Sequence, residues 1–251
     1  IMSKCYKYTD EKYEVFVENS VFIKDKEKNV YLKSELKNLP KSIQESLNEY
    51  TPKVTVIKFA SIITFFIFLL FINVILLNHS DTKIQSISAN LHLAYIFLFF
   101  YLSLNIFIHE LGHIKSLNYI GKKHQKIGFK MNYYIFPAIY VEMNEIYLIS
   151  KNEKIIVHLA GLITNYLTIN FIQVINLLFL KNKILDSSFI FFSYALLWNL
   201  VPVLNSDGYK VLITLFSVDE LENKRKNHLI VKLIQAISLL LVIETVISWF
   251  V

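Results

Sequence analysis

The sequence has few of the residues that build disulfide-bonded or loop-rich proteins. Its 251 residues include one cysteine, four prolines and five glycines. A single cysteine, Cys5, excludes an intrachain disulfide, and we interpret it as an incidental thiol because every other candidate metal ligand lies far along the chain. Internal repeats, low-complexity segments and Pro/Gly-rich stretches are also absent, which argues against repeat architectures and long flexible linkers.

Charged residues are scarce as well, at 18%, whereas hydrophobic residues make up 54% and aromatic residues 15%. A mean hydropathy of +0.44 is too high for an ordinary soluble domain of this length. Crossing a bilayer takes about 20 consecutive apolar residues. Five windows approach that length: 55–77, 91–118, 155–180, 188–204 and 228–250. We therefore predict an all-α polytopic membrane protein with about five transmembrane helices, and a half-helix over 207–217.

The net charge of +6 does not indicate nucleic-acid binding, because the lysines follow a pattern typical of membrane proteins. Ten lysines precede residue 54, whereas the loop at 78–90 contains only Lys83 and the loop after the third span only Lys181 and Lys183. By the positive-inside rule we expect the amino terminus in the cytoplasm and the carboxyl terminus outside. No cleavable signal peptide is apparent, so we expect the first span to direct insertion.

Residues 1–53 are predicted to form a small α+β cytoplasmic segment, distinct from the transmembrane domain at 54–251. Alternating apolar and polar residues predict two strands, a turn, a returning strand and a short helix, at 13–19, 20–24, 25–29, 29–34 and 41–49. A strand pair with one helix is only marginally stable alone. We therefore expect this segment to dock on the membrane domain or on a partner.

Residues 127–148 are rich in tyrosine and phenylalanine and alternate imperfectly. This pattern favours a short β element, formed by a strand pair, or a re-entrant loop at the membrane surface over a sixth span. Two functions are open for it: capture of an extended substrate by strand addition, or anchoring of the chain by aromatic side chains at the membrane interface.

The stretch NIFIHELGHIKSL, residues 105–117, places ionisable groups inside an apolar span. The spacing of His109 and His113 puts both imidazoles on one helix face, where they can bind one zinc ion, with Glu110 beside them as a general base. The alternative is chance, with both histidines satisfied inside a helix bundle, but such groups are costly in a span. A zinc hydrolase needs a third protein ligand, and Asp207, at the end of the fourth span, stands out.

Three separated motifs resemble the site-2 protease family of intramembrane zinc metalloproteases. They are HELGH at 109–113, LAGLITN at 159–165 and NLVPVLNSDG at 199–208. The resemblance covers roughly 91–217, with Leu162 in place of a family proline and Tyr209 in place of a common glycine. The Asp-Gly-Tyr ending is most similar to a branch linked to processing or export of small secreted peptides.

The resemblance implies that zinc is bound by His109, His113 and Asp207, with Glu110 as general base. It also implies Asn165 as a polar group of the site, which can bind the substrate backbone or the developing oxyanion. Gly161, one turn before Asn165, is expected to let the third span approach the zinc helix closely. The charge pattern places the ligands on the cytoplasmic side.

These observations predict an intramembrane zinc endopeptidase in a bacterial cell membrane, which hydrolyses membrane-inserted or membrane-associated peptides near the cytoplasmic face. One alternative is a non-proteolytic, zinc-binding component of a peptide export or immunity system. Another is a protease subunit that works only beside a transporter or another peptide-processing partner. Glu110 discriminates against the non-proteolytic protein, because a structural zinc site needs no general base.

Overall fold

The computed structural model describes residues 4–80, 91–132, 136–203, 206–218, 228, 229, 231–234, 236–238 and 240. The chain forms two compact units. Residues 1–59 and 114–154 make the first unit, and residues 60–113 and 155–251 make the second. The boundary at residue 53 was drawn on composition and stays a prediction.

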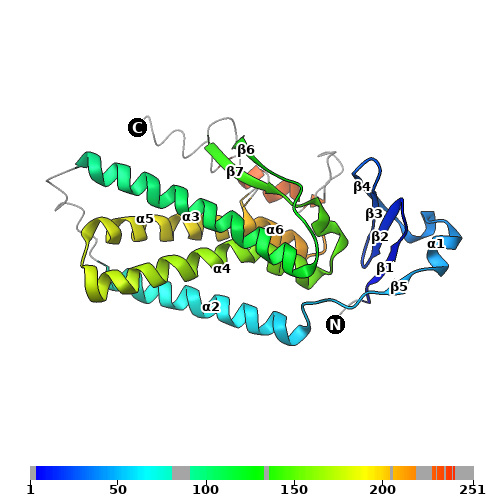
Figure 1. The fold of residues 1–251 in the computed structure, drawn as a ribbon, viewed down its shortest axis with the longest axis horizontal. Helices are drawn as coiled ribbons and strands as arrows, with labels where there is room; N and C mark the ends of the chain where they lie inside the picture. Colours follow the sequence, from blue (N-terminus) through cyan, green and yellow to red (C-terminus); the bar gives the residue numbers. More distant parts are fainter. Residues whose placement is uncertain are drawn as a thin grey trace. The chain divides into compact units, whose positions relative to one another are not determined.

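The first unit contains a five-stranded antiparallel sheet in the order β4-β3-β2-β1-β5 (Figure 1). Its strands are β1 (Tyr6–Thr9), β2 (Tyr13–Val17), β3 (Val21–Asp25), β4 (Val30–Ser34) and β5 (Asn48–Glu49). The three predicted strands correspond to β2, β3 and β4. The predicted helix is α1 (Lys41–Glu45), shorter than expected because the chain turns into β5. Neither β1 nor β5 was predicted.

Both faces of this sheet are covered, because apolar side chains point to each side of β2 and β3. On one face Val15 and Val21 pack with Leu39 and with Ile43 of α1. On the other, Phe16 and Phe22 pack against residues that include Leu148, in the short helix η3 (Asn144–Leu148). The amino-terminal segment therefore docks on the chain that follows the hairpin described next.

A two-stranded hairpin lies between the zinc-motif helix and the next long helix in the chain. It pairs β6 (Lys126–Asn132) with β7 (Phe136–Glu142), and Phe129 is opposite Ile139. These strands match the β element predicted at 127–148. Ile127, Phe129 and Ile139 are exposed, which is the apolar surface expected of an element at a membrane interface.

A buried cluster of ion pairs joins the sheet to both ends of this hairpin. The Lys122 ammonium lies 2.7 Å from the Glu14 carboxylate and 3.0 Å from that of Glu145. Glu14 also pairs with Lys7 at 2.8 Å, and Glu145 pairs with Lys24. Burial alone would raise the pKa of Glu14 and of Glu145, but hydrogen bonds and charge from these lysines outweigh it, and both pKa values are lowered.

Glu153, fully buried, organises the start of α4 (Lys151–Ile175). Its carboxylate accepts hydrogen bonds from the backbone N–H and the hydroxyl of Ser150, which together form the return half of a capping box. The same carboxylate accepts from the Tyr50 hydroxyl and the Lys53 backbone N–H. One side chain thus holds the beginning of α4 to the segment that leads into α2.

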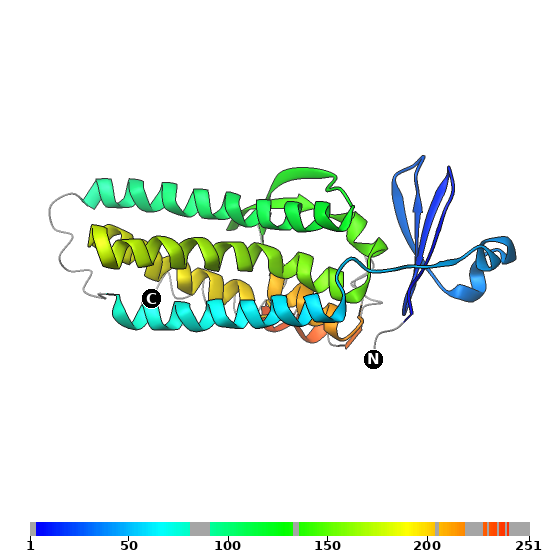
Figure 2. The same cartoon turned by 60° about the horizontal axis from the view of Figure 1, so that its bottom comes forward.

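The second unit is a bundle of long helices that run side by side (Figures 1 and 2). The elements are α2 (Val56–His79), α3 (Leu91–Ile120), α4, the π-helical turn η4 (Asn176–Leu180), α5 (Lys183–Leu200) and α6 (Asp207–Leu215). Residues 114–120 of α3 and 151–154 of α4 belong to the first unit. The predicted half-helix at 207–217 corresponds to α6.

Three described helices are long and apolar enough to cross a membrane: Val56–His79, Ala94–Ile120 and Lys151–Leu180. They correspond to the first three predicted spans, and the chain is a membrane protein. The fourth predicted span is helical and corresponds to α5, but this helix of 18 residues is not among the three candidate spans. The fifth prediction, at 228–250, falls mostly outside the described residues. Five crossings therefore stay a prediction.

Polar groups inside the bundle are paired with one another, while large apolar side chains face outward. Phe71, Phe99 and Phe171 are all more than 60% exposed, as lipid-facing residues of a span are expected to be. Buried Asn73 of α2 donates to the Asn170 side-chain carbonyl of α4 at 2.8 Å and to the Ser193 hydroxyl of α5 at 3.1 Å. Such bonds join helices where no water competes.

Acid is expected to loosen the first unit. The pKa values of Glu14 and Glu145 are lower in the folded protein than in the unfolded chain, so their stabilising effect is full above about pH 4.3. It is lost as the pH falls through the folded values. Hydrogen–deuterium exchange of the full-length protein, corrected for intrinsic rates, should show residues 1–59 and 114–154 losing protection between pH 5 and pH 3.

A Glu14→Gln, Glu145→Gln double variant is the matched control, because its amides do not titrate. It should lose protection in the first unit already at pH 7 and respond less to acid. Full protection of the wild-type unit at pH 3 would contradict the role given to these ion pairs.

Candidate metal centre

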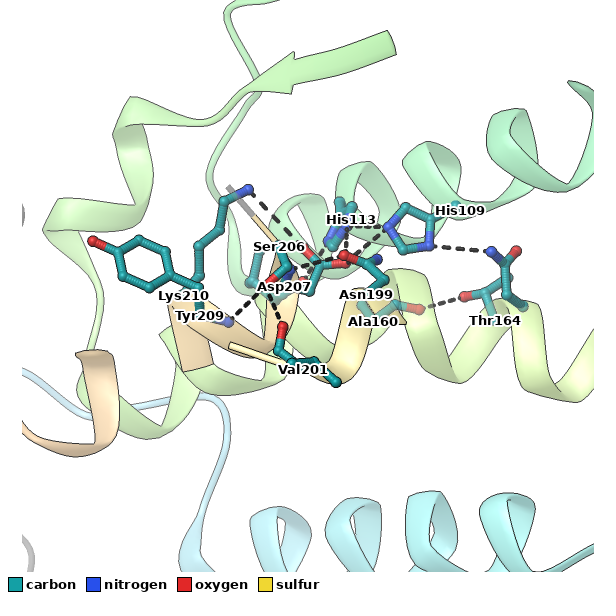
Figure 3. A network of polar contacts seen from close by, with 12 residues as sticks. His109, His113, Ala160, Thr164, Asn199, Val201, Ser206, Asp207, Tyr209 and Lys210 are labelled. Atoms are coloured by element: carbon teal, nitrogen blue, oxygen red, sulfur yellow. Dashed lines mark hydrogen bonds and ion pairs between the residues drawn. The ribbon is translucent and has the colours of Figure 1, made fainter. Parts of the chain in front are cut away.

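The two histidines of the HELGH motif lie on the face of α3 that packs on α4 (Figure 3). The Nε2 atoms of His109 and His113 are 3.1 Å apart, as i, i+4 spacing on a helix allows. A Cβ at Gly161 of α4 would come within 2.5 Å of His113 Nε2 and 2.6 Å of His109 Cε1. Glycine at this position therefore leaves the space that the imidazoles fill.

Asp207 is the first residue of α6, which begins close to the end of α5, and its carboxylate contacts the histidines. Ser206 caps α6 by accepting a hydrogen bond from the Tyr209 backbone N–H at 3.0 Å. A Cβ at Gly208 would lie 1.9 Å from the Leu200 carbonyl oxygen, so only glycine allows the chain to return so closely to the end of α5. This explains why the acid is followed by glycine.

Asn199, the last asparagine of α5, holds Asp207 with two hydrogen bonds. Its Nδ2 donates to Asp207 Oδ2 at 3.0 Å, and its Oδ1 accepts from the Asp207 backbone N–H at 3.1 Å (Figure 3). Sequence reasoning included Asn199 in the third motif but gave it no role. The eight-residue spacing between Asn199 and Asp207 was the signal that the sequence offered. The reason for this spacing is visible only in the structure, where the chain returns and the two side chains meet.

The three predicted ligands converge on one point. Asp207 Oδ2 lies 2.8 Å from His109 Nε2 and 3.5 Å from His113 Nε2. Ligand atoms about 2.0–2.1 Å from a tetrahedral zinc are separated by about 3.3 Å, so these distances fit one ion. Within the described residues this is the group of His, Cys, Asp and Glu side chains that meets the spacing of a metal site. It contains none of the other histidines.

The Nδ1 atoms of both histidines also have polar neighbours. His113 Nδ1 lies 2.7 Å from the Val157 carbonyl oxygen, so it carries the proton and leaves Nε2 free for a metal. His109 Nδ1 lies 3.2 Å from Nδ2 of Asn165. Asn165 is thus next to the ring nitrogen that faces away from the ligand cluster, and its predicted contact with substrate stays a prediction.

Two further charged groups border the ligands. Glu110, adjacent to His109 on α3, is half-buried, and no hydrogen bond or ion pair holds its carboxylate within the part of the chain that the structure describes. Its carboxylate is therefore not committed to another described side chain. The ammonium of Lys210 lies 4.0 Å from Oδ1 of Asp207, the carboxylate oxygen that does not contact the histidines.

Two histidines one helical turn apart and an aspartate from a different helix provide the three protein ligands of a zinc hydrolase, with one position left for water. The chain belongs to the peptide zinc metalloproteases. It is 43% identical over 246 residues to the protein named "Putative peptide zinc metalloprotease protein YydH" of Bacillus subtilis (strain 168), an alignment that spans 98% of this chain and 97% of that relative. No protein-family profile and no solved structure matches it.

This relationship and the ligand geometry together confirm zinc as the cofactor. They also confirm the predicted metalloprotease class.

Gly161→Ala is expected to abolish most zinc binding, because the added methyl group needs the space of both imidazoles. Metal analysis of the purified protein should find about one zinc per chain in the wild type and far less in the variant. Leu162→Ala is the control: it removes a fully buried side chain at the next position and should lower stability while keeping zinc. Full zinc occupancy in Gly161→Ala would show that the histidines are not confined as described.

Proposed function

We propose that this protein is an intramembrane zinc endopeptidase of the site-2 type, which cuts membrane-inserted or membrane-associated peptides near the cytoplasmic face. The observation that carries this proposal is the position of His109 and His113 inside the apolar helix Ala94–Ile120. A peptidase that acts only in water has no need to keep its metal ligands in such a helix, where ionisable groups are costly.

Peptide hydrolysis needs a general base beside the ligands, and Glu110 supplies it. Zinc, when bound, acts as a Lewis acid that activates water and polarises the scissile carbonyl. The Glu110 carboxylate takes the proton of the attacking water and returns it to the leaving amine. Asn199 and Ser206 keep Asp207 in place during this exchange. The unengaged carboxylate of Glu110 favours a hydrolase over a structural zinc protein.

The substrate must present an unwound backbone, because a helix hides its carbonyls in its own hydrogen bonds. Residues that weaken helices, such as glycine, proline, asparagine or serine, are therefore expected near the cut. The hairpin β6–β7 is the candidate for holding such a segment by strand addition. A small secreted peptide, delivered to or from a transporter, is the substrate class that the resemblance favours.

Replacing Glu110 with glutamine is expected to abolish cleavage while zinc content and fold are kept, because an amide cannot accept the proton. The assay is incubation of the zinc-loaded protein with membrane peptides, with products read by mass spectrometry. Substrates whose helix-weakening residues are replaced by leucine should be cut more slowly at equal membrane insertion. Undiminished cleavage by Glu110→Gln would remove Glu110 as the base.

Thiol labelling tests the proposed orientation. In a Cys5→Ser background, a cysteine at Lys183 should react with an impermeant reagent added outside cells, and a cysteine at Lys123 should not. Because Cys5 is the only cysteine of the chain, its replacement leaves the introduced cysteine as the only thiol that can react. The reverse labelling pattern would move the active site to the other membrane face.

A further inference from the structure

Two buried side-chain oxygens beside the ligands have no hydrogen-bond partner among the described residues. They are Oδ1 of Asn165 on α4 and Oδ1 of Asn105 on α3, and each residue is 1% exposed. An unpaired amide oxygen inside an apolar bundle is unfavourable, because it has given up its hydrogen bonds to water without gaining others. Two of them near one histidine call for a common explanation.

Both asparagines lie next to His109 in the register of the two helices. His113 of α3 is opposite Val157 of α4, and His109 is opposite Gly161 and Asn165, so the helices run antiparallel. One turn before His109 on the same face of α3 is Asn105. Its register partner on α4 is the turn that begins at Asn165.

Asn105 is held in place by its other amide atom. Its Nδ2 donates to the Tyr101 carbonyl oxygen one turn earlier in α3, at 2.8 Å. That bond uses the donor side of the amide and leaves Oδ1 as an acceptor. A donor for this oxygen is therefore missing among the described residues.

Metal binding at His109 changes the hydrogen bond that Asn165 has to make with this histidine. With Nε2 committed to the ion, Nδ1 carries the proton and has to donate a hydrogen bond. The Nδ2 atom of Asn165, now 3.2 Å away, is itself a donor and cannot accept it. A half-turn of the amide exchanges its oxygen and nitrogen, which brings the unpaired Oδ1 to Nδ1 and directs Nδ2 to where Oδ1 lies now.

We propose that Asn165 and Asn105 are positioning residues that form an amide relay behind His109, and this inference rests on the zinc site described above. In the loaded protein Asn165 Oδ1 accepts from His109 Nδ1–H, and Asn165 Nδ2 donates to Asn105 Oδ1. One rotation thus satisfies both unpaired oxygens and fixes His109 as an Nε2 ligand. Asn105 acts only through Asn165.

The test measures zinc dissociation constants of the purified full-length protein by competition with a chromogenic chelator. Asn165→Leu should weaken zinc binding about 10–100-fold, the usual effect of losing such a partner of a ligand. Asn105→Leu should weaken it less, and the double variant should bind zinc like Asn165→Leu alone, because the second residue acts through the first. Asn165→Asp keeps an acceptor and should stay near the wild-type constant.

Asn73→Leu is the matched control, since it removes a buried asparagine whose side chain bonds to Asn170 and Ser193 rather than to a metal ligand. It should lower stability and leave the zinc constant unchanged. If a leucine variant does not fold, the alanine variant at that position is measured on the same scale. Wild-type affinity in Asn165→Leu, or fully additive losses in the double variant, would overturn the relay. Failure of the wild type to bind zinc would instead overturn the proposed function.

Discussion

The close approach of α3 to α4 at Gly161 is the interaction on which the site depends. Without a side chain at that position, both imidazoles fit between the helices, and Gly112 on the other helix comes similarly close to Ala160 and Thr164. The same approach sets the register that brings His113 to the Val157 carbonyl and His109 to Asn165. Close packing therefore places the ligands and selects the ring nitrogens that face the ion.

Polar residues along α4 extend this arrangement to the rest of the bundle. Asn170 donates to the Leu69 carbonyl of α2, and Gln173 and Asn176 both donate to the Asp186 carboxylate of α5. In an apolar interior each of these groups must find a partner within the protein. By ordering α5, these bonds also fix its far end, where Asn199 begins the turn that returns Asp207 to the histidines.

The first unit is stabilised differently from the helix bundle, because its sheet is small and carries many charged side chains. Its second face is covered by Leu148, and its buried carboxylates are matched by lysines from several elements. Lys122, which follows α3 directly, and Glu153, in the first turn of α4, are both part of these contacts. The end of α3, which carries His109 and His113, and the start of α4, which packs on these histidines, are thus ordered by hydrogen bonds and ion pairs of the first unit.

Hydropathy by itself predicted the three long apolar helices, alternation the β element at 127–148, and i, i+4 spacing the pair His109 and His113, because these patterns are local properties of the sequence. Asp207 was predicted from its motif, and only the structure brings it to both histidines. Strands β1 and β5 escaped prediction because YKYT and a two-residue strand carry too little alternation to be distinguished from loops. The role of Asn199 appeared only in the tertiary structure, since it depends on the return of the chain that brings Asp207 to the end of α5. Contacts between residues that are distant in sequence depend on tertiary packing, and a short sequence motif does not specify that packing.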